Sequence, residues 1–233
     1  MKRALSFIAA MLLTAATGFA QTVNVHKTDG TTVTIPLSLV DYIDFTAAGE
    51  TSQPPEGVEA VDLGLPSGTK WANMNVGATS PEDYGYYFRW AETTPSVDGD
   101  TENSYPYLGV DFGESIAGTQ YDAAMVNWGI SWKMPTIEQI EELMENCTYT
   151  WTAQNGINGA KVIGSNGAYI FLPASGCRSF SSGTLNFVGS DGYYWTATPF
   201  SANYGRGIFF NSYFTRWINQ TRAYGFPVRA VTQ

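Results

Sequence analysis

The sequence predicts an α+β protein: a loop-rich domain with few helices and many short strands and loops, preceded by a small β unit. Two observations lead to this prediction. Helix signals in the body of the chain are confined to residues 80–146. After residue 149, short apolar segments alternate with Asn-Gly and Asp-Gly dipeptides, which favour tight turns. Many turns between short strands, with few helices beside them, are typical of the α+β class.

The first twenty residues have the form of a secretion signal. Lys2 and Arg3 give a basic start, an apolar run follows over residues 4–19, and Gly18 and Ala20 are the small residues expected before a cleavage site. Thr and Gly interrupt this run, whereas a membrane span needs about 20 largely apolar residues. We therefore expect an exported protein in the periplasm, at the cell surface or released, with no integral membrane segment after cleavage.

The charge balance is strongly acidic. The 233 residues carry 12 Lys and Arg against 21 Asp and Glu, a formal net charge of −9. Cleavage after residue 20 removes two positive charges and no acid, so the mature chain carries −11. Such a chain repels nucleic acid and anionic lipid, so neither is an expected partner. The 44% hydrophobic and 15% aromatic content is enough for a packed core and excludes a disordered chain.

Residues 21–46 are expected to form the small β unit. Apolar and polar residues alternate over residues 23–25 and 33–35, and Asp29-Gly30 between them favours a hairpin turn. A second short apolar run covers residues 40–45. A unit of this size is not stable alone, so we expect it to dock or to pair with another strand.

A linker over residues 47–57 leads into the main domain, residues 58–233, because its Gly, Ser and paired Pro residues sustain neither strand nor helix. Three helices are expected in the domain. A Ser-Pro-Glu-Asp start predicts a short one over residues 80–85. A second covers residues 121–128. The clearest covers residues 136–146, where a Thr-x-x-Gln capping box precedes an apolar stripe at helical spacing.

The rest of the domain is expected to form short strands joined by turns. The strand candidates are rich in β-branched and aromatic residues; they are residues 161–163, 169–173, 193–198, 207–212 and 225–231. The turn signals are Asn155-Gly156, Asn158-Gly159, Asn166-Gly167 and Asp191-Gly192.

Several segments of the domain match the motifs of a known family. They are residues 61–72 (VDLGLPSGTKWA), 75–78 (NVGA), 121–124 (YDAA), 127–129 (NWG), 132–136 (WKMPT), 170–176 (IFLPASG), 192–198 (GYYWTAT) and 225–231 (GFPVRAV). In this order they resemble the Fibrobacter succinogenes major paralogous domain. The resemblance implies a C-type-lectin-like fold related to the formylglycine-generating enzymes, with paired terminal strands, two main helices and a loop-rich half that carries binding. It also implies surface display, and the small β unit after the signal is similar to that of exported Bacteroidetes-type proteins.

No catalytic constellation can be built in the main domain. The only histidine, His26, lies in the small β unit at an outward position of the alternation, so no Ser-His-Asp or Cys-His arrangement is available. Formylglycine-generating activity would need two cysteines late in the domain, and neither Cys147 nor Cys177 lies where the resemblance requires. Glu138 and Glu142 share a helix face, as a solvated stripe would, which makes a carboxylate enzyme the weakest alternative. We expect no enzyme and no cofactor.

Segment 98–103 and the two cysteines are the candidates for a metal site and a disulfide. The acidic segment 98–103 lacks EF-hand spacing, and the chain has no Glu-Pro-Asn, Gln-Pro-Asp or Trp-Asn-Asp motif of calcium-dependent lectins. We therefore expect a surface turn there and no metal. Outside the cytoplasm Cys147 and Cys177 could form a disulfide, but spacing does not show that they meet. A bridge and two separate buried thiols both stay open.

The candidate binding region is the segment 193–226, which holds 12 aromatic residues among 34. Part of it fits buried strands, but residues 211–222 do not alternate and mix aromatic with long polar side chains. Rings give rigid contact area and stack on sugars, while Arg and Asn form directional hydrogen bonds and Arg can bind an anionic group. The predicted ligand-binding residues are Tyr204, Arg206, Asn211, Tyr213, Phe214, Arg216, Trp217, Asn219 and Arg222.

Three functions fit these features. The first is an exported, non-catalytic module that binds a glycan or protein ligand at the cell surface through these C-terminal loops. The second is a structural or subunit component of a surface assembly, in which residues 22–46 contribute strands to a partner. The third is a variable binding protein of the diversity-generating-retroelement type, which the Tyr-, Asn-, Ser- and Arg-rich end of the domain resembles.

Overall fold

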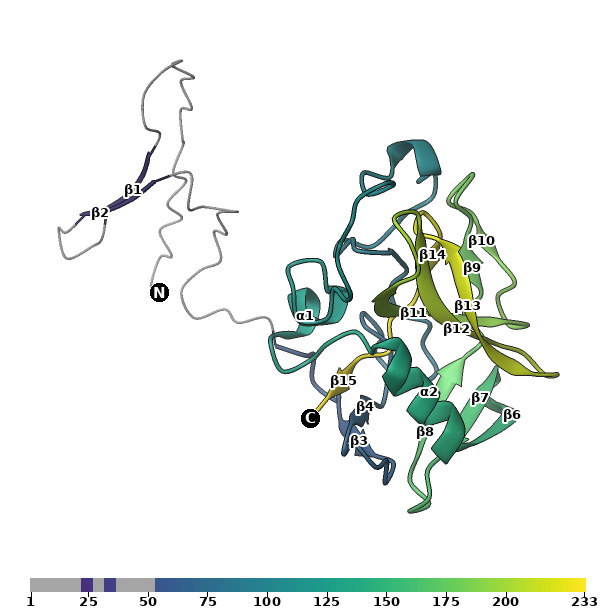
Figure 1. Ribbon diagram of the computed structural model, residues 1–233. Helices are drawn as coiled ribbons and strands as arrows, with labels where there is room; N and C mark the ends of the chain where they lie inside the picture. Colours follow the sequence, from purple (N-terminus) through teal and green to yellow (C-terminus); the bar gives the residue numbers. More distant parts are fainter. Residues whose placement is uncertain (1–21, 27–31, 37–52) are drawn as a thin grey trace, which may run out of the picture. The chain divides into compact units, whose positions relative to one another are not determined.

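The computed structural model describes residues 22–26, 32–36 and 53–233, and the chain divides into two compact units, residues 1–47 and 48–233 (Figure 1). In the first unit, β1 (Thr22–His26) and β2 (Thr32–Pro36) pair as an antiparallel hairpin. Val23 lies opposite Ile35, as the alternation predicted. The secretion signal, the Asp29-Gly30 turn, the run over residues 40–45 and the first part of the linker lie outside the described residues.

The second unit is an α+β domain with few helices, which confirms the predicted class. Its described residues form two α-helices, α1 (Ala123–Trp128) and α2 (Ile137–Asn146), and the 3₁₀ turn η2 (Glu102–Ser104). The remaining regular structure is short antiparallel strands joined by turns. Both α-helices lie within the ranges predicted for them, residues 121–128 and 136–146.

Within the described part of this unit, the strands form four antiparallel sheets. The first joins the two ends of the domain: β3 (Ala60–Asp62), β4 (Lys70–Ala72) and β15 (Val231–Thr232), with β4 central. The second is a meander of β6 (Thr148–Gln154), β7 (Ile157–Ile163) and β8 (Tyr169–Pro173). The third is a meander of β11 (Gly192–Pro199), β12 (Tyr204–Phe210) and β13 (Thr215–Thr221). The fourth, in the order β10-β9-β14-β5, holds β10 (Leu185–Asn186), β9 (Cys177–Arg178), β14 (Gly225–Phe226) and β5 (Phe88–Arg89).

Helix α2 packs against both the second and the third sheet. Its N-terminus is closed by the predicted capping box, in which the Thr136 hydroxyl accepts the Gln139 N–H and the Gln139 amide oxygen accepts the Thr136 N–H. Its apolar stripe is buried in one cluster with residues of β7, β8, β11 and β12. The other face of β11 and β12 packs into a second cluster around Trp195 and Phe209. The last three residues of β12, residues 208–210, are therefore covered on both faces, which explains their continuous apolar run.

A buried polar network connects the two ends of the domain. Arg229 is 1% exposed, and its guanidinium donates to the carbonyl oxygens of Ala72 (3.0 Å) and Phe171 (2.8 Å) and to the Asn75 amide oxygen (2.8 Å). The Asn75 amide nitrogen in turn donates to the Tyr194 hydroxyl at 3.2 Å. Burial lowers the pKa of Arg229 to about 10.

Two predicted details are wrong. Residues 80–85 form turns in place of a helix, because the Asp83 carboxylate accepts the N–H groups of Thr79 (3.1 Å) and Gly85 (3.2 Å) and closes a turn. The Asn-Gly pair at 158–159 lies inside β7 and is no turn. A Cβ at Gly159 would stand 2.4 Å from the Leu172 carbonyl oxygen, so the close approach of β8 requires this glycine.

Several strands differ from the predicted ones, and two of the predicted turns are confirmed. Strand β7 covers Ile157–Ile163 where residues 161–163 were predicted, and β12 covers Tyr204–Phe210 where residues 207–212 were predicted. Strand β6, which alternates Thr with Tyr and Trp, was not predicted, although it pairs with β7 over its whole length. The candidate at residues 225–231 is divided into β14 and β15, with Pro227 just after β14. The turns at Asn155-Gly156 and Asn166-Gly167 are present.

The two cysteines are free thiols, so the disulfide that the sequence left open is not formed. Cys147 caps the C-terminus of α2 and is partly exposed, whereas Cys177 is buried in β9. Burial raises the pKa of the Cys177 thiol to about 12 and also raises that of Cys147.

We therefore expect iodoacetamide to label Cys147 in the native protein and Cys177 only after unfolding. The thiolate is the reactive species, and Cys177 lacks both thiolate and access. Intact-mass measurement should show one adduct before denaturation and two after it, without reductant. A denatured, unreduced chain that takes up no label would show that the two cysteines form a bridge.

Candidate functional site

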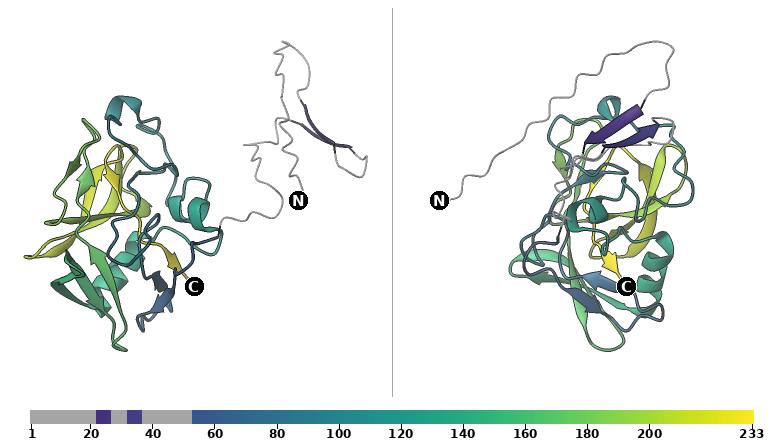
Figure 2. Two further views of the ribbon diagram at one scale, coloured as in Figure 1. Left: turned by 180° about the vertical axis from the view of Figure 1, so that it is seen from behind. Right: turned by 90° about the vertical axis from the view of Figure 1, so that its left-hand side faces the viewer.

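The predicted binding residues lie mainly on a β-hairpin and not on loops. Residues 215–221 form β13, which pairs along its whole length with β12. The alternation was hidden because β13 is an edge strand, on which only Ile218 is buried. The turn end of this hairpin protrudes from the outline of the unit, in Figure 1 and from behind in the left view of Figure 2.

The register divides the predicted residues between the two faces of the hairpin. Residues directly opposite one another on neighbouring strands share a face. Arg206 lies opposite Asn219, Tyr204 opposite Thr221, and Ile208 opposite Trp217. Tyr204, Arg206, Trp217 and Asn219 therefore occupy one face, whereas Arg216, opposite Phe209, occupies the other.

We name the first of these surfaces the hairpin face; it consists of Phe200, Tyr204, Arg206, Trp217 and Asn219. Trp217 and Phe200 are each 53% exposed and Tyr204 is 44% exposed. The Arg206 guanidinium carbon lies over the Phe200 ring, 5.7 Å from its centroid. Three open aromatic rings thus flank an arginine and an amide.

Polar atoms on the hairpin face have hydrogen-bonding capacity that the protein does not use. The Arg206 Nε and the Asn219 Oδ1 are buried and have no hydrogen-bond partner in the structure. A buried polar group without a partner costs about 1–3 kcal/mol, so such atoms call for an explanation. Within the described residues, the ion pairs involve Arg89 and Arg178, and Arg206 has no acidic partner.

The hairpin turn and the opposite face hold four further predicted residues. The Asn211 side chain accepts the N–H groups of Tyr213 (2.9 Å) and Phe214 (3.3 Å), so it shapes the turn. Tyr213 is 88% exposed at the turn, away from the other rings. Arg216 lies over the rings of Phe209 and Phe214, at 5.5 and 5.3 Å from their centroids.

Arg222 is a structural residue, and its prediction as a binding residue is wrong. It is 1% exposed, and its guanidinium donates to the carbonyl oxygens of Val110 (2.8 Å) and Ser201 (2.7 Å). Its guanidinium carbon also lies 4.2 Å from the centroid of the Trp90 ring. Arg222 therefore anchors the loop around residue 110 to the base of the hairpin and is closed to ligands.

Sequence reasoning missed Phe200, which follows β11 and has no periodic signal. It also missed a charge signal. Residues 146–233 contain six Lys and Arg and a single acid, Asp191, so 20 of the 21 acidic residues precede this segment. The hairpin thus belongs to the cationic part of an acidic chain.

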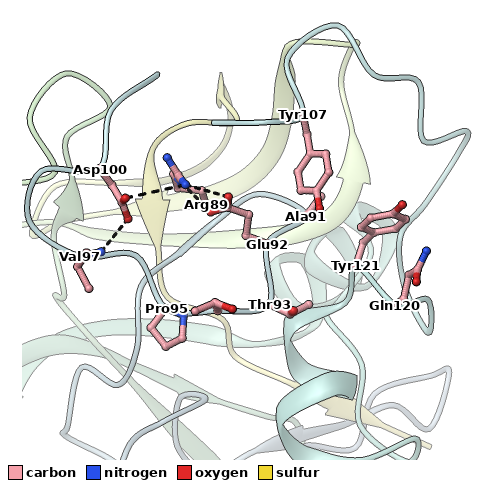
Figure 3. Close-up of a pocket in the computed structure, with 11 residues that line it drawn as sticks. Arg89, Ala91, Glu92, Thr93, Pro95, Val97, Asp100, Tyr107, Gln120 and Tyr121 are labelled. Carbon is pink, nitrogen blue, oxygen red and sulfur yellow. Dashed lines mark hydrogen bonds and ion pairs between the residues drawn. The ribbon is translucent and has the colours of Figure 1, made fainter. Parts of the chain in front are cut away.

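A separate cavity of about 660 Å³ lies beside β5 (Figure 3). The polar side chains that line it are paired with one another. The Arg89 Nε and Nη2 donate to the two Glu92 carboxylate oxygens at 2.6 and 2.9 Å, and an Asp100 carboxylate oxygen lies 3.9 Å from Nη2. The Arg89 Nη1 donates to the Thr101 carbonyl oxygen (3.2 Å) and the Ser104 hydroxyl (2.8 Å). Burial raises the pKa of Glu92 against the opposing effect of Arg89. These contacts hold the loop 97–104 on β5, so we assign the cavity floor a structural role.

Neither metal nor membrane features are found in the described part of the chain. No group of three or more His, Cys, Asp or Glu residues there is arranged to hold a metal ion. In the acidic segment, Asp98 pairs with Arg178 and Asp100 accepts the Val97 N–H at 2.8 Å, as in an ordinary surface turn. None of the described helices has the length and apolar character needed to span a membrane.

In comparisons with known proteins, no family model, curated protein or solved structure matches the chain.

Proposed function

We propose that residues 58–233 form a non-catalytic binding module that holds a glycan on the hairpin face. The observation that carries the proposal is the concentration of open rings: eight aromatic side chains are exposed among the described residues, and five of them lie within residues 200–217. Three of these five surround Arg206 and Asn219, whose buried polar atoms have no partner.

A glycan fits this chemistry better than a purely apolar ligand. Sugar rings present C–H groups that stack on aromatic faces, and hydroxyl groups that form hydrogen bonds with Arg and Asn side chains. The hairpin face offers both kinds of contact within one stretch of two paired strands.

The proposal includes the C-type-lectin-like fold and export to the cell envelope or surface. The pairing of β4 with β15, which joins the ends of the domain, and the two helices support such a fold. The basic start and apolar run of residues 1–20 support export. On this view the exported domain presents the hairpin face to glycans outside the cytoplasm.

A glycan array probed with residues 21–233 tests the proposal, and Tyr204→Ala is expected to weaken binding about tenfold. Loss of one stacked ring at a binding centre costs more than about 1 kcal/mol, and 1.4 kcal/mol is tenfold in affinity. Tyr169→Ala is the matched control, because Tyr169 is 46% exposed but lies on β8. Absence of any bound glycan, or equal losses for the two variants, would count against the hairpin face.

A further inference from the structure

We infer that the hairpin face selects an anionic glycan, with Arg206 binding its carboxylate or sulfate group. This inference deepens the proposed function and rests on it. The starting point is that Arg206 has a guanidinium group but no acid to neutralise it among the described residues. The buried Arg222 and Arg229 also lack an acid, but their guanidinium groups donate to carbonyl oxygens of the protein, whereas the Arg206 Nε has no partner.

The surroundings of Arg206 favour a negative ligand. Residues 146–233 carry six cations and one acid, and the strands of the hairpin, residues 204–221, contain no acidic residue. This segment therefore carries a net positive charge within an acidic chain, which favours an anionic ligand. The Glu102 carboxylate contacts only its end, where it accepts the Thr221 hydroxyl at 3.3 Å.

The position of Arg206 suits a directional contact. The guanidinium carbon lies 5.7 Å from the centroid of the Phe200 ring, a contact that uses none of its N–H donors. Arg–carboxylate and Arg–sulfate contacts can be bidentate, and they are stronger where neighbouring rings exclude water. Tyr204, two residues before Arg206 on the same face, and Trp217, two residues before Asn219, leave room for sugar rings on either side.

The other two surfaces of the domain are less suited to an anion. In the cavity beside β5, two carboxylates face one guanidinium. On the opposite face of the hairpin, the exposed Arg216 lies over two rings, and neither Arg216 nor Gln220 has a buried side-chain atom that lacks a hydrogen-bond partner. Arg216 is therefore the appropriate control for non-specific attraction.

The test compares acidic polysaccharides with neutral ones of the same backbone: polygalacturonate with its methyl ester, and dextran sulfate with dextran. We expect the wild-type chain to prefer one acidic probe over its neutral counterpart at least tenfold, and Arg206→Gln to remove that preference. Arg206→Lys should keep part of the preference, because lysine retains the positive charge but lacks the two parallel N–H donors of a guanidinium. Arg216→Gln should change the affinity by less than about twofold, since the charge lies on the opposite face.

The outcomes of this test distinguish the type of anion, the preference for an anion and the binding of glycans. Preference for polygalacturonate identifies the anion as a carboxylate, and preference for dextran sulfate identifies it as a sulfate. Equal losses from Arg206→Gln and Arg216→Gln would show general electrostatic attraction and overturn the inference. Equal binding of acidic and neutral probes, with Tyr204→Ala still weakened, would overturn the anion preference and leave the glycan proposal standing. No binding of any polysaccharide or array glycan would overturn both.

Discussion

Replacing Arg229 by Met is expected to destabilise the domain by about 3–5 kcal/mol, because buried acceptors lose their only charged donor. The guanidinium satisfies the carbonyl oxygens of Ala72 and Phe171 and the Asn75 amide oxygen, at 2.8 to 3.0 Å. Met fills a similar space but donates nothing, so three oxygens would stay buried without a partner. For a domain of this length, a loss of this size lowers the melting temperature by about 10 °C.

Arg216→Met is the matched control for this prediction. Arg216 is exposed and covers the rings of Phe209 and Phe214, a role that Met can take over. Its replacement should change the unfolding free energy by less than about 0.5 kcal/mol, as surface substitutions usually do. Urea unfolding followed by circular dichroism measures both variants. If Arg229→Met unfolds at the same urea concentration as the wild type, the network is not what holds the ends of the domain together.

The Arg229 network gives a structural role to several of the sequence motifs. Five of the eight segments quoted as motifs in the sequence analysis each contribute one member of the network: residues 61–72, 75–78, 170–176, 192–198 and 225–231. The members are Ala72, Asn75, Phe171, Tyr194 and Arg229. These five motifs therefore contribute to the packing of the domain.

Local signals predicted the two α-helices well, but they predicted a helix over residues 80–85 that is absent and they missed the edge strand. The α2 capping box and apolar stripe lie within a few residues of one another, so the chain shows them directly. The pattern of β13 depends on what covers each face, and this is decided by β12 and the rest of the fold, far away in the sequence. A strand with one buried residue in seven has no alternation to read.

The sequence predicted which segment holds the candidate binding residues, but not which of them are buried or which face of the hairpin each one occupies. Exposed Trp217, Tyr204 and Tyr213 lie in the segment that the aromatic and polar mixture indicated. The same mixture could not show that Arg222 is buried against Trp90, nor that Arg206 and Arg216 lie on opposite faces. Those distinctions come from strand register and from a loop that crosses the base of the hairpin.

Trp217→Ala is expected to have the largest effect on binding. Trp217 lies opposite Ile208, is half exposed and is the largest open ring on the hairpin face. Tryptophan anchors at the centre of a binding surface contribute about 2–4 kcal/mol, which corresponds to a loss of roughly 30-fold or more in affinity. Because only part of the side chain is buried, the variant should remain folded, and circular dichroism and the melting temperature check this.

The most direct test of the binding site is isothermal titration of the tightest array glycan into wild type, Trp217→Ala and Tyr213→Ala. Tyr213 is the matched control: it is 88% exposed, lies four residues away and belongs to the hairpin turn, not to the hairpin face. We predict at least a 30-fold loss for Trp217→Ala and less than about a twofold change for Tyr213→Ala, in keeping with near-neutral residues outside a binding centre. Unchanged affinity of a folded Trp217→Ala variant, or an equal loss for both variants, would contradict the assignment of binding to the hairpin face.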